Sequence, residues 1–440
     1  MSGELVKIQR ADSEDGKRVL SALFRRTVDI PKDIEHAVQD ILDKVKSNGD
    51  KALCDFTGRF DCPGFEPSMI PVGVQEVEEA FKQVDRSLVL AIEKARSKIE
   101  AFHQRQLPNS WFQTQDDGVI LGQMVRPVDA AGLYVPGGQG GRTPLVSSVL
   151  MNAIPAKIAG VKRIILCTPP GKDGKVSPAL LVAARLSGVS QIYRVGSAWA
   201  VAAMAFGTET IRPVDVIAGP GNIYVTAAKK LVSGTVAIDM IAGPSEILII
   251  ADDTAKPSFV AADMLSQAEH DPMATSILLT TSYKLAEDTI RELETQLREL
   301  DRAETARKAL ESNGFIIVTS NLKQACGISN TIAPEHLELM VKDPWSLVPR
   351  IRHAGAVFLG SFSPEPIGDY IAGPNHVLPT MGTARFSSAL GVETFMKRTS
   401  LICYSKDGFM EDADQVMILA EVEGLTAHKQ SVKVRKEDVS

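Results

Sequence analysis

Short apolar runs alternate with longer segments of helical period from Arg163 onward, and this alternation restricts the fold more than any other feature. Runs that are apolar throughout are typical of parallel strands, because helices cover both faces of a parallel sheet. The expected strands are 163–168, 191–195 and 214–218, and the expected helices are 178–186, 198–206 and 225–232. The pattern predicts a parallel α/β sheet in this part of the chain.

A second series of the same kind follows further along the chain. Its expected strands are 247–251, 276–280, 315–318 and 356–360, and its expected helices are 259–270 and 285–300. The two series predict an α/β protein with two Rossmann-like parallel-sheet domains. Ligands of open α/β sheets collect at the carboxyl ends of the strands, so we expect a ligand cleft there, between the two units.

The remaining segments predict the surroundings of these sheets. A glycine-rich stretch at 135–141 suits neither regular helix nor strand, and we place a domain boundary just before it. Residues 84–103 predict one long amphipathic helix. The tail from residue 391 contains an amphipathic segment at 412–423 and ends in mixed charge, so we expect it to be an appendage.

Length and charge exclude several classes of protein. A chain of 440 residues is too long for one ordinary core, so two or more domains are expected. The net charge is −6 and the basic residues are scattered, which argues against nucleic acid as a partner. Residues 1–7 are charged where a secretory signal is apolar, and no run is long enough to span a bilayer. We therefore expect a soluble cytoplasmic protein without a membrane partner. Its five cysteines form no C-x-x-C pair, so we expect them to be reduced thiols.

A candidate metal site begins in the segment 266–271. If this segment is helical, Gln267 and His270 lie one turn apart and project from the same face. Three later segments, 333–336, 368–370 and 426–428, supply further imidazole and carboxylate groups. A mixed nitrogen and oxygen set suits zinc or manganese and leaves coordination positions for a substrate, which predicts a catalytic site.

The loop 219–222 follows an expected strand and opens an expected helix. Its main-chain N–H groups can face an anion such as a dinucleotide pyrophosphate, or the loop can be a simple tight turn. The G-x-G-x-x-G fingerprint is absent, because Tyr224 occupies the place of the third glycine. A similar stretch at 243–246 offers Ser245 and Glu246, each either a polar contact or a turn residue.

Glu335 and His336 are adjacent, and adjacent side chains on extended or turn backbone diverge. The pair can therefore address two atoms of one substrate, one group taking a proton and the other activating water. The alternative is structural: His336 caps a helix and Glu335 is a charge favoured at its N-terminus.

Two more histidines stand out by their surroundings. His376 lies in a rigid loop, 373–376, and His428 follows Glu423 in the tail, where it is either a site residue or an exposed terminal one.

Nine motifs together make the chain resemble the histidinol dehydrogenase family over nearly its whole length. They are 132–138 (GLYVPGG), 151–156 (MNAIPA), 219–222 (GPGN), 243–246 (GPSE), 266–270 (SQAEH), 334–337 (PEHL), 368–370 (GDY), 373–380 (GPNHVLPT) and 425–428 (LTAH). The resemblance implies two successive NAD-dependent oxidations, from L-histidinol to the aldehyde and, through its hydrate, to L-histidine.

The resemblance also implies roles for individual residues. One zinc ion per subunit would be held by Gln267, His270, Asp369 and His428, with the substrate imidazole and amine in the open positions. His336 would take the hydroxyl proton, and Glu335 would activate the water that adds to the aldehyde.

Further contacts follow from the same motifs. Ser245, His376 and Glu423 would contact the substrate, Glu423 by accepting a hydrogen bond from the imidazole. Tyr134 and Asn222 would contact NAD. Trp199 stands where the family commonly has a glutamine, and we expect it to stack on the cofactor instead. The loop 139–146 also differs from the family's shorter, tyrosine-containing version, which would alter cofactor affinity or the substrate entrance.

The family is a homodimer in which small terminal regions cross over, so Glu423 and His428 would enter the partner's site. The implied domains are an N-terminal arm at 1–31, a substrate and zinc domain at 32–133 and 247–390, an NAD-side domain at 134–246, and a dimer-crossing region at 391–440.

Two other functions remain in competition. A paralogous zinc and NAD alcohol dehydrogenase would act on an alcohol without an imidazole, such as sulfopropanediol, but Glu423 would repel an anionic sulfonate. A catalytically silent metal-binding or assembly subunit is the second, and the intact pair of Glu335 and His336 weighs against it.

Overall fold

The computed structural model describes residues 5–137 and 143–439, and the chain divides into two compact units. The larger unit comprises Met1–Gln106 and Asp129–Phe395, and the smaller unit comprises Leu107–Val128 and Met396–Ser440. The tail was expected to be an appendage, and from residue 396 onward it belongs to the smaller unit. The contribution of residues 107–128 to the same unit was not predicted.

The larger unit contains a five-stranded parallel sheet in the order β6-β5-β4-β7-β8. The strands are β4 (Ala130–Tyr134), β5 (Arg163–Cys167), β6 (Gln191–Tyr193), β7 (Val216–Ala218) and β8 (Ala237–Ile238). The helices between them are α5 (Val146–Ala159), α6 (Pro178–Ser187), α7 (Ser197–Phe206) and α8 (Ile223–Val232). The predicted parallel sheet is confirmed, with boundaries that differ by a few residues.

The predicted boundary between residues 133 and 134 is wrong, because β4 is the middle strand of the five-stranded sheet. This strand ends only at Tyr134 and includes two alanines and a glycine, which weakened its β-branched signal. Small residues fit here because helices pack closely: a Cβ on Gly132 would lie 2.6 Å from Met204 Sδ.

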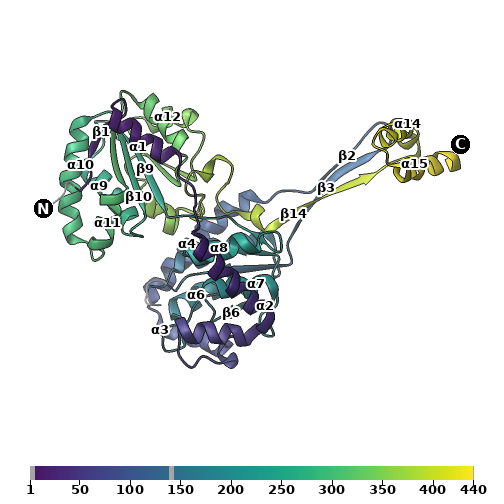
Figure 1. Ribbon diagram of the computed structural model, residues 1–440, viewed down its shortest axis with the longest axis horizontal. Coiled ribbons are helices and arrows are strands. Elements are labelled where there is room, and N and C mark those ends of the chain that lie inside the picture. The colour runs from purple at the N-terminus through teal and green to yellow at the C-terminus, as the bar shows by residue number, and fades with distance from the viewer. Residues whose placement is uncertain (1–4, 138–142, 440) are drawn as a thin grey trace. The chain divides into compact units, whose positions relative to one another are not determined.

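A six-stranded parallel sheet forms the other part of the larger unit, in the order β1-β11-β10-β9-β12-β13. Figure 1 labels its strands β1, β9 and β10. Its strands are β1 (Ile8–Arg10), β9 (Glu246–Ala251), β10 (Thr275–Thr280), β11 (Gly314–Val318), β12 (His336–Met340) and β13 (Ala356–Leu359). Its helices are α1 (Glu14–Phe24), α9 (Pro257–Ala268), α10 (Tyr283–Gln296), α11 (Ala303–Asn313) and α12 (Leu322–Ile332). The short α13 (Glu365–Ile367) continues into a π-helical turn, Gly368–Ala372.

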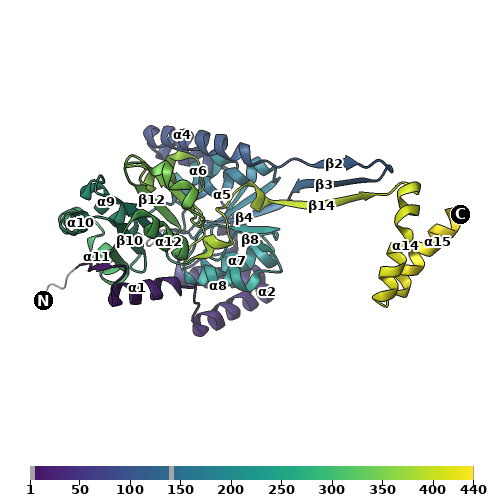
Figure 2. The same cartoon turned by 90° about the horizontal axis from the view of Figure 1, so that it is seen from above.

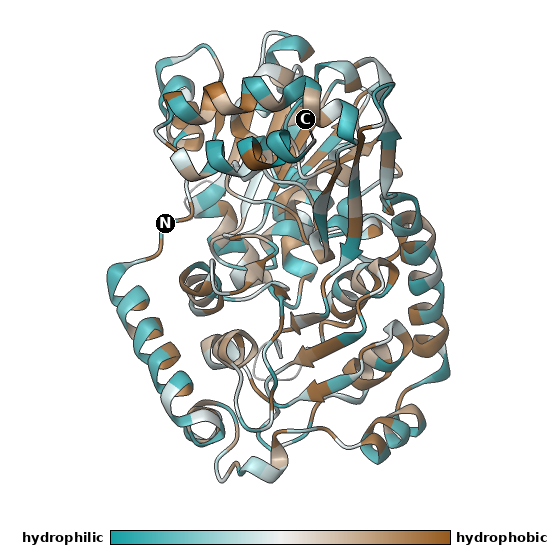
Figure 3. Cartoon of the chain, turned by 90° about the vertical axis from the view of Figure 1, so that its right-hand side faces the viewer, coloured by the Kyte–Doolittle hydropathy of each residue, from teal (hydrophilic) through white to brown (hydrophobic). Residues whose placement is uncertain are grey.

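Alternate residues of the six-stranded sheet face two different cores, as helical cover on both faces requires. Ile247 and Ile249 of β9 pack in the cluster that includes α9, α10 and α11. Leu248 and Ile250 pack in the cluster that includes α1 and α12. In Figure 3 brown, hydrophobic strand segments lie among helices that carry teal, hydrophilic residues.

The helices before β4 do not follow the expected domain division. α2 (Lys32–Phe60) packs on α7 and α8, α3 (Val74–Gln83) packs on α6, and α4 (Arg86–His103) packs on α5. They therefore cover the five-stranded sheet, not the six-stranded sheet with which 32–133 was grouped. The described part of the expected N-terminal arm likewise joins the six-stranded sheet, because β1 pairs with β11.

The smaller unit is an antiparallel sheet followed by two helices. β3 (Ile120–Pro127) pairs with both β2 (Trp111–Thr114) and β14 (Met396–Cys403), and α14 (Lys406–Val422) and α15 (Thr426–Val439) follow in the chain (Figure 2). Within the described residues, no helix is long and apolar enough to cross a membrane.

Candidate active site

The centre of the site is formed where β9 and β12 begin. Glu246 is the first residue of β9, His336 is the first residue of β12, and the parallel register pairs His336 with Ile247. The N–H of Glu246 donates to Glu335 Oε2 at 2.8 Å, and its carbonyl lies 2.9 Å from His336 Nδ1. One residue of β9 thus holds both members of the candidate catalytic pair through its main chain.

These residues lie at the amino ends of the strands, so the expected position at the carboxyl ends is wrong for this sheet. The expected extended or turn backbone is confirmed, because Glu335 lies in a bend and His336 begins β12, and the same observation excludes the helix-cap alternative.

The hydrogen bond to Glu246 fixes the tautomer of His336. A carbonyl only accepts, so Nδ1 carries the proton of the neutral ring and Nε2 is left with its lone pair. Nε2 is buried and has no hydrogen-bond partner among the described residues. Burial lowers the pKa of His336, although the Asp369 carboxylate opposes the shift. The ring is therefore a neutral base whose accepting nitrogen is free.

Glu335 is 5 % exposed and sits in an acidic environment. Burial raises the pKa of its carboxyl well above the usual range, and the neighbouring carboxylates of Glu246, Glu365 and Asp369 add to the shift. A carboxyl group with a raised pKa binds a proton readily, as a base that acts on water must.

The metal candidates meet beside His336. Gln267 lies in the last turn of α9, which ends at Ala268, so His270 follows the helix rather than belonging to it. The two side chains still touch, with Gln267 Nε2 3.1 Å from His270 Nδ1. Gln267 Oε1 is buried and has no hydrogen-bond partner in the described part of the chain, which leaves an oxygen donor available.

Glu365 is a member of this site that the sequence did not reveal. One ligand atom each from His270, Glu365 and Asp369 lie within 4.8 Å of one another. Glu365 is 1 % exposed, its Oε2 accepts from Ser266 Oγ at 3.2 Å, and burial raises its pKa to about 8. Its only sequence signal is an acid one helical turn before Asp369.

His376 is the last of the candidate site residues that meet in the larger unit. Its Nδ1 lies 3.0 Å from the carbonyl oxygen of Asp369, and burial lowers its pKa. The preceding loop is held by Asn375 Nδ2, which donates to the carbonyl of Met151 at 2.6 Å. Asp369, His336 and His376 line a cavity of about 480 Å³ whose other walls include Phe358 and Leu378.

The turn between β7 and α8 is built as a strand, turn and helix, as predicted. Gly219 has φ +126°, and a Cβ there would lie 2.0 Å from the carbonyl oxygen of Tyr134. Asn222 caps α8, its Oδ1 accepting from the N–H groups of Tyr224 and Val225 at 3.1 and 3.2 Å. Tyr134 is 4 % exposed, and its hydroxyl accepts from the N–H of Ser197 at 3.1 Å.

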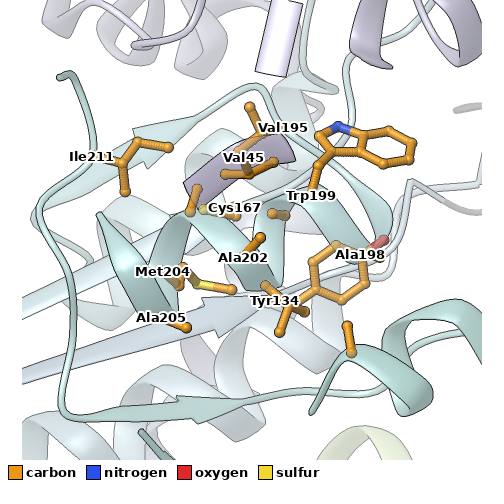
Figure 4. Packing of buried hydrophobic residues seen from close by; sticks show 14 of the residues in the cluster. Val45, Tyr134, Cys167, Val195, Ala198, Trp199, Ala202, Met204, Ala205 and Ile211 are labelled. Carbon is orange, nitrogen blue, oxygen red and sulfur yellow. The ribbon is translucent and has the colours of Figure 1, made fainter. Parts of the chain in front are cut away.

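Trp199 does not have the surroundings of a cofactor contact. Its indole is 5 % exposed and stacks with Phe56 and Phe60, each with ring centroids 5.7 Å away. Its Nε1 donates to Thr57 Oγ1 at 3.1 Å. Figure 4 shows Trp199 and Tyr134 in the same packed cluster. The expected stacking on the cofactor is therefore wrong, because α2, which the sequence had not placed here, covers the ring.

Ser245 directly precedes Glu246, the first residue of β9, and is half-buried. Two predicted site residues lie in the smaller unit. Glu423 at the end of α14 and His428 in α15 are exposed and belong to the smaller unit. In the loop 139–146, residues 139–142 lie outside the described part of the chain.

Comparisons with known proteins identify the family. A family model described as histidinol dehydrogenase matches residues 24–436. This chain belongs to the histidinol dehydrogenase family. The histidinol dehydrogenase of Desulfotalea psychrophila is 55 % identical over 431 residues, which cover 98 % of this chain and 99 % of that protein. The one from Nitratidesulfovibrio vulgaris is 56 % identical over 402 residues, or 91 % and 92 % of the two chains.

Membership of the histidinol dehydrogenase family also accounts for the fold. A crystal structure of histidinol dehydrogenase from Elizabethkingia anophelis superposes with a TM-score of 0.92 at 40 % identity and covers 100 % of both chains. The matched proteins are named for the oxidation of histidinol, so the comparisons give no support to a paralogue specific for another alcohol.

Proposed function

We propose that the protein oxidises L-histidinol to L-histidine in two NAD-dependent steps, as the last reaction of histidine biosynthesis. The observation that carries this proposal is the buried, unpartnered Nε2 of His336, which lies 3.9 Å from Asp369 Oδ1 and beside the donor cluster. In each step two electrons and one proton leave the carbon as hydride, and one further proton is released.

The donor set fits a zinc ion. Gln267 supplies an amide oxygen, His270 an imidazole nitrogen and Asp369 a carboxylate oxygen, and nitrogen and oxygen donors are ordinary zinc ligands. We assign the fourth ligand to the partner's His428. Zinc, when bound, supplies a positive charge that orients and polarises the substrate.

His336 acts in the first oxidation. Its Nε2 accepts the proton of the substrate hydroxyl while hydride leaves the adjacent carbon, and NAD, when bound, supplies the hydride acceptor. The bond from Nδ1 to Glu246 stabilises the imidazolium that forms, because a carbonyl attracts the donor more strongly once the ring is charged.

Glu335 acts between the two steps. Its carboxylate removes a proton from the water that adds to the aldehyde, which produces the hydrate that is oxidised next. The N–H of Glu246 holds Oε2 in place, so the other carboxylate oxygen is the one available to water.

The contacts to the substrate and to NAD are assigned from the family's motifs. His376 and Ser245 contact the substrate in the larger unit, and the partner's Glu423 accepts a hydrogen bond from the substrate imidazole. For NAD we propose Asn222 and Tyr134. Support comes from Tyr134, whose O–H remains free to donate while its oxygen accepts from Ser197.

We also propose that the enzyme is a homodimer in which the smaller unit of each chain completes the partner's site. The smaller unit exposes apolar side chains as a protein interface does. Phe112 is 76 % exposed, Ile402 is 72 % exposed and Val422 is 81 % exposed.

The proposed function is tested by following NADH formation from L-histidinol with zinc-loaded protein. We expect two NADH for each histidine formed, and a higher KM in the variant Glu423→Gln. Turnover of other alcohols but not histidinol, or no turnover at all despite bound zinc, would overturn the proposal.

A further inference from the structure

We infer that Arg26 is a positioning residue for the catalytic pair and acts through Glu246. Arg26 follows α1, far from the site in sequence, and its Nη1 lies 2.8 Å from Glu246 Oε1. The inference rests on the proposed function, because it explains how Glu335 and His336 are held for that reaction.

Glu246 needs a cation. Its side chain is 1 % exposed, and a carboxylate removed from water costs several kcal/mol unless it is paired. Arg26 makes the one ion pair found for this carboxylate among residues 5–137 and 143–439, and its own side chain is 15 % exposed. Burial raises the pKa of Glu246, and the Arg26 charge is the first effect that opposes this shift.

Arg26 is itself held in a fixed place. Its Nε donates to the carbonyl of Leu23 in the last turn of α1 at 3.0 Å. The helix α1 packs on α12, and the strand before it, β1, pairs with β11. The N-terminal segment therefore presents the guanidinium to Glu246 from a rigid support.

The ion pair reaches the catalytic groups through the main chain of one residue. The N–H of Glu246 fixes Glu335, and its carbonyl fixes His336. Glu246 is the first residue of β9. Without Arg26 its buried carboxylate would be unpaired, and the end of the strand would shift to bring that carboxylate closer to water. Such a shift moves both hydrogen bonds at once. A misplacement of about 1 Å at a reacting group lowers a rate by roughly 100-fold.

The test compares four variants of the full-length, zinc-loaded enzyme. Arg26→Met removes the cation, Arg26→Lys restores a charge without the planar fork, and Arg26→Met with Glu246→Gln removes both charges. Arg25→Met is the matched control, because Arg25 is exposed and, among the described residues, its side chain bonds to Ser21 of the preceding helix α1.

We expect Arg26→Met to lower kcat by about tenfold or more while the KM for histidinol changes by less than about twofold. Arg26→Lys should recover part of kcat. The double variant should have a higher kcat than Arg26→Met, because no buried charge is left unpaired in it. Arg25→Met should match the wild type. If kcat per folded molecule is unchanged in Arg26→Met, or the double variant is no better, the inference is wrong.

A crystal structure of Arg26→Met separates this inference from the proposed function. We expect the Glu246–Glu335 and Glu246–His336 hydrogen bonds to lengthen or break in it. Unchanged bonds would overturn the inference whatever the substrate of the enzyme, whereas a wild-type enzyme inactive on histidinol would overturn only the proposed function.

Discussion

At the scale of single residues, the site depends on polar atoms that the fold leaves without a partner. Buried polar atoms are nearly always hydrogen-bonded, so each exception calls for a reason. His336 Nε2, Gln267 Oε1 and Glu365 Oε1 are three such atoms. Because they belong to residues that touch or face Asp369 and His270, we interpret them as groups that bind a substrate or a metal ion.

Replacing His336 with asparagine should remove the base without removing the fold. We expect kcat to fall by about 10²- to 10⁴-fold, the usual contribution of a general base. Zinc content and thermal stability should stay close to those of the wild type. Steady-state NADH formation measures the effect, with His36→Asn, at an exposed position, as the control. A His336→Asn variant with half of the wild-type kcat would exclude the assigned role.

Replacing Gln267 with methionine keeps the volume of the side chain but removes its unpartnered oxygen. Zinc affinity should fall by more than about tenfold, because one of four ligands is lost. The metal-free variant should unfold at nearly the wild-type temperature, because the change removes a buried oxygen without a partner, and His270, which loses its contact with Gln267 Nε2, is exposed and can bond to water instead. Metal analysis after dialysis and calorimetry of the metal-free proteins give the two readings. Full zinc retention would contradict the ligand assignment.

At the scale of elements, helix α9 and strand β12 meet at a pair of buried acids behind the site. Asp263 lies on α9 and is 7 % exposed, and Glu338 lies on β12 and is 1 % exposed. Glu338 Oε1 also accepts from the N–H of Glu365 at 2.8 Å. Burial raises the pKa of Asp263 to about 6 from its usual 3.8, and it raises that of Glu338 as well.

The Asp263 shift makes stability depend on pH. A carboxyl group whose pKa is raised by folding binds its proton more tightly in the folded state, so its contribution is complete below pH 3.8 and is lost as the pH rises through about 6. Asp263→Asn removes this titration. Between pH 4 and 7 the metal-free wild type should therefore lose about 2 kcal/mol of unfolding free energy relative to the variant. Urea unfolding at both pH values measures the difference, and equal losses in the two proteins would refute the explanation.

At the scale of the whole molecule, the proposed zinc ligands belong to two separate units of the chain. Gln267, His270 and Asp369 lie in the larger unit, and His428 lies in the smaller unit. If the smaller unit of each chain completes the site of the partner subunit, two variants that are inactive alone should form an active site when they are combined in one dimer.

Mixing unfolded Gln267→Met and His428→Ala chains and refolding them together tests this. Half of the dimers should be mixed, and each mixed dimer should contain one site with all its ligands, so about one quarter of the wild-type activity should return. The matched control mixes Gln267→Met with His270→Ala, whose changes lie in the same unit, and should restore nothing. No activity in the first mixture would mean that each chain completes its own site.

Most of the elements could be predicted from the sequence, because the period of the hydrophobic residues reflects local helix or strand structure. The strands near 163–168 and 247–251 and the helices near 198–206 and 259–270 were predicted within about two residues of their ends in the structure. The sequence also indicated Gln267, His270, Glu335, His336, Asp369 and His376 as candidates, since their motifs are local.

The sequence did not reveal which distant segments share a sheet. β4 was missed because close helix packing favours small residues there, and α2 was placed with the wrong sheet because an amphipathic helix does not encode which apolar surface it covers. The roles of Trp199 as a packing residue, of Glu365 as a site acid and of Arg26 beside Glu246 were likewise invisible. Each depends on a contact across a large separation in the chain, which no local pattern of residues records.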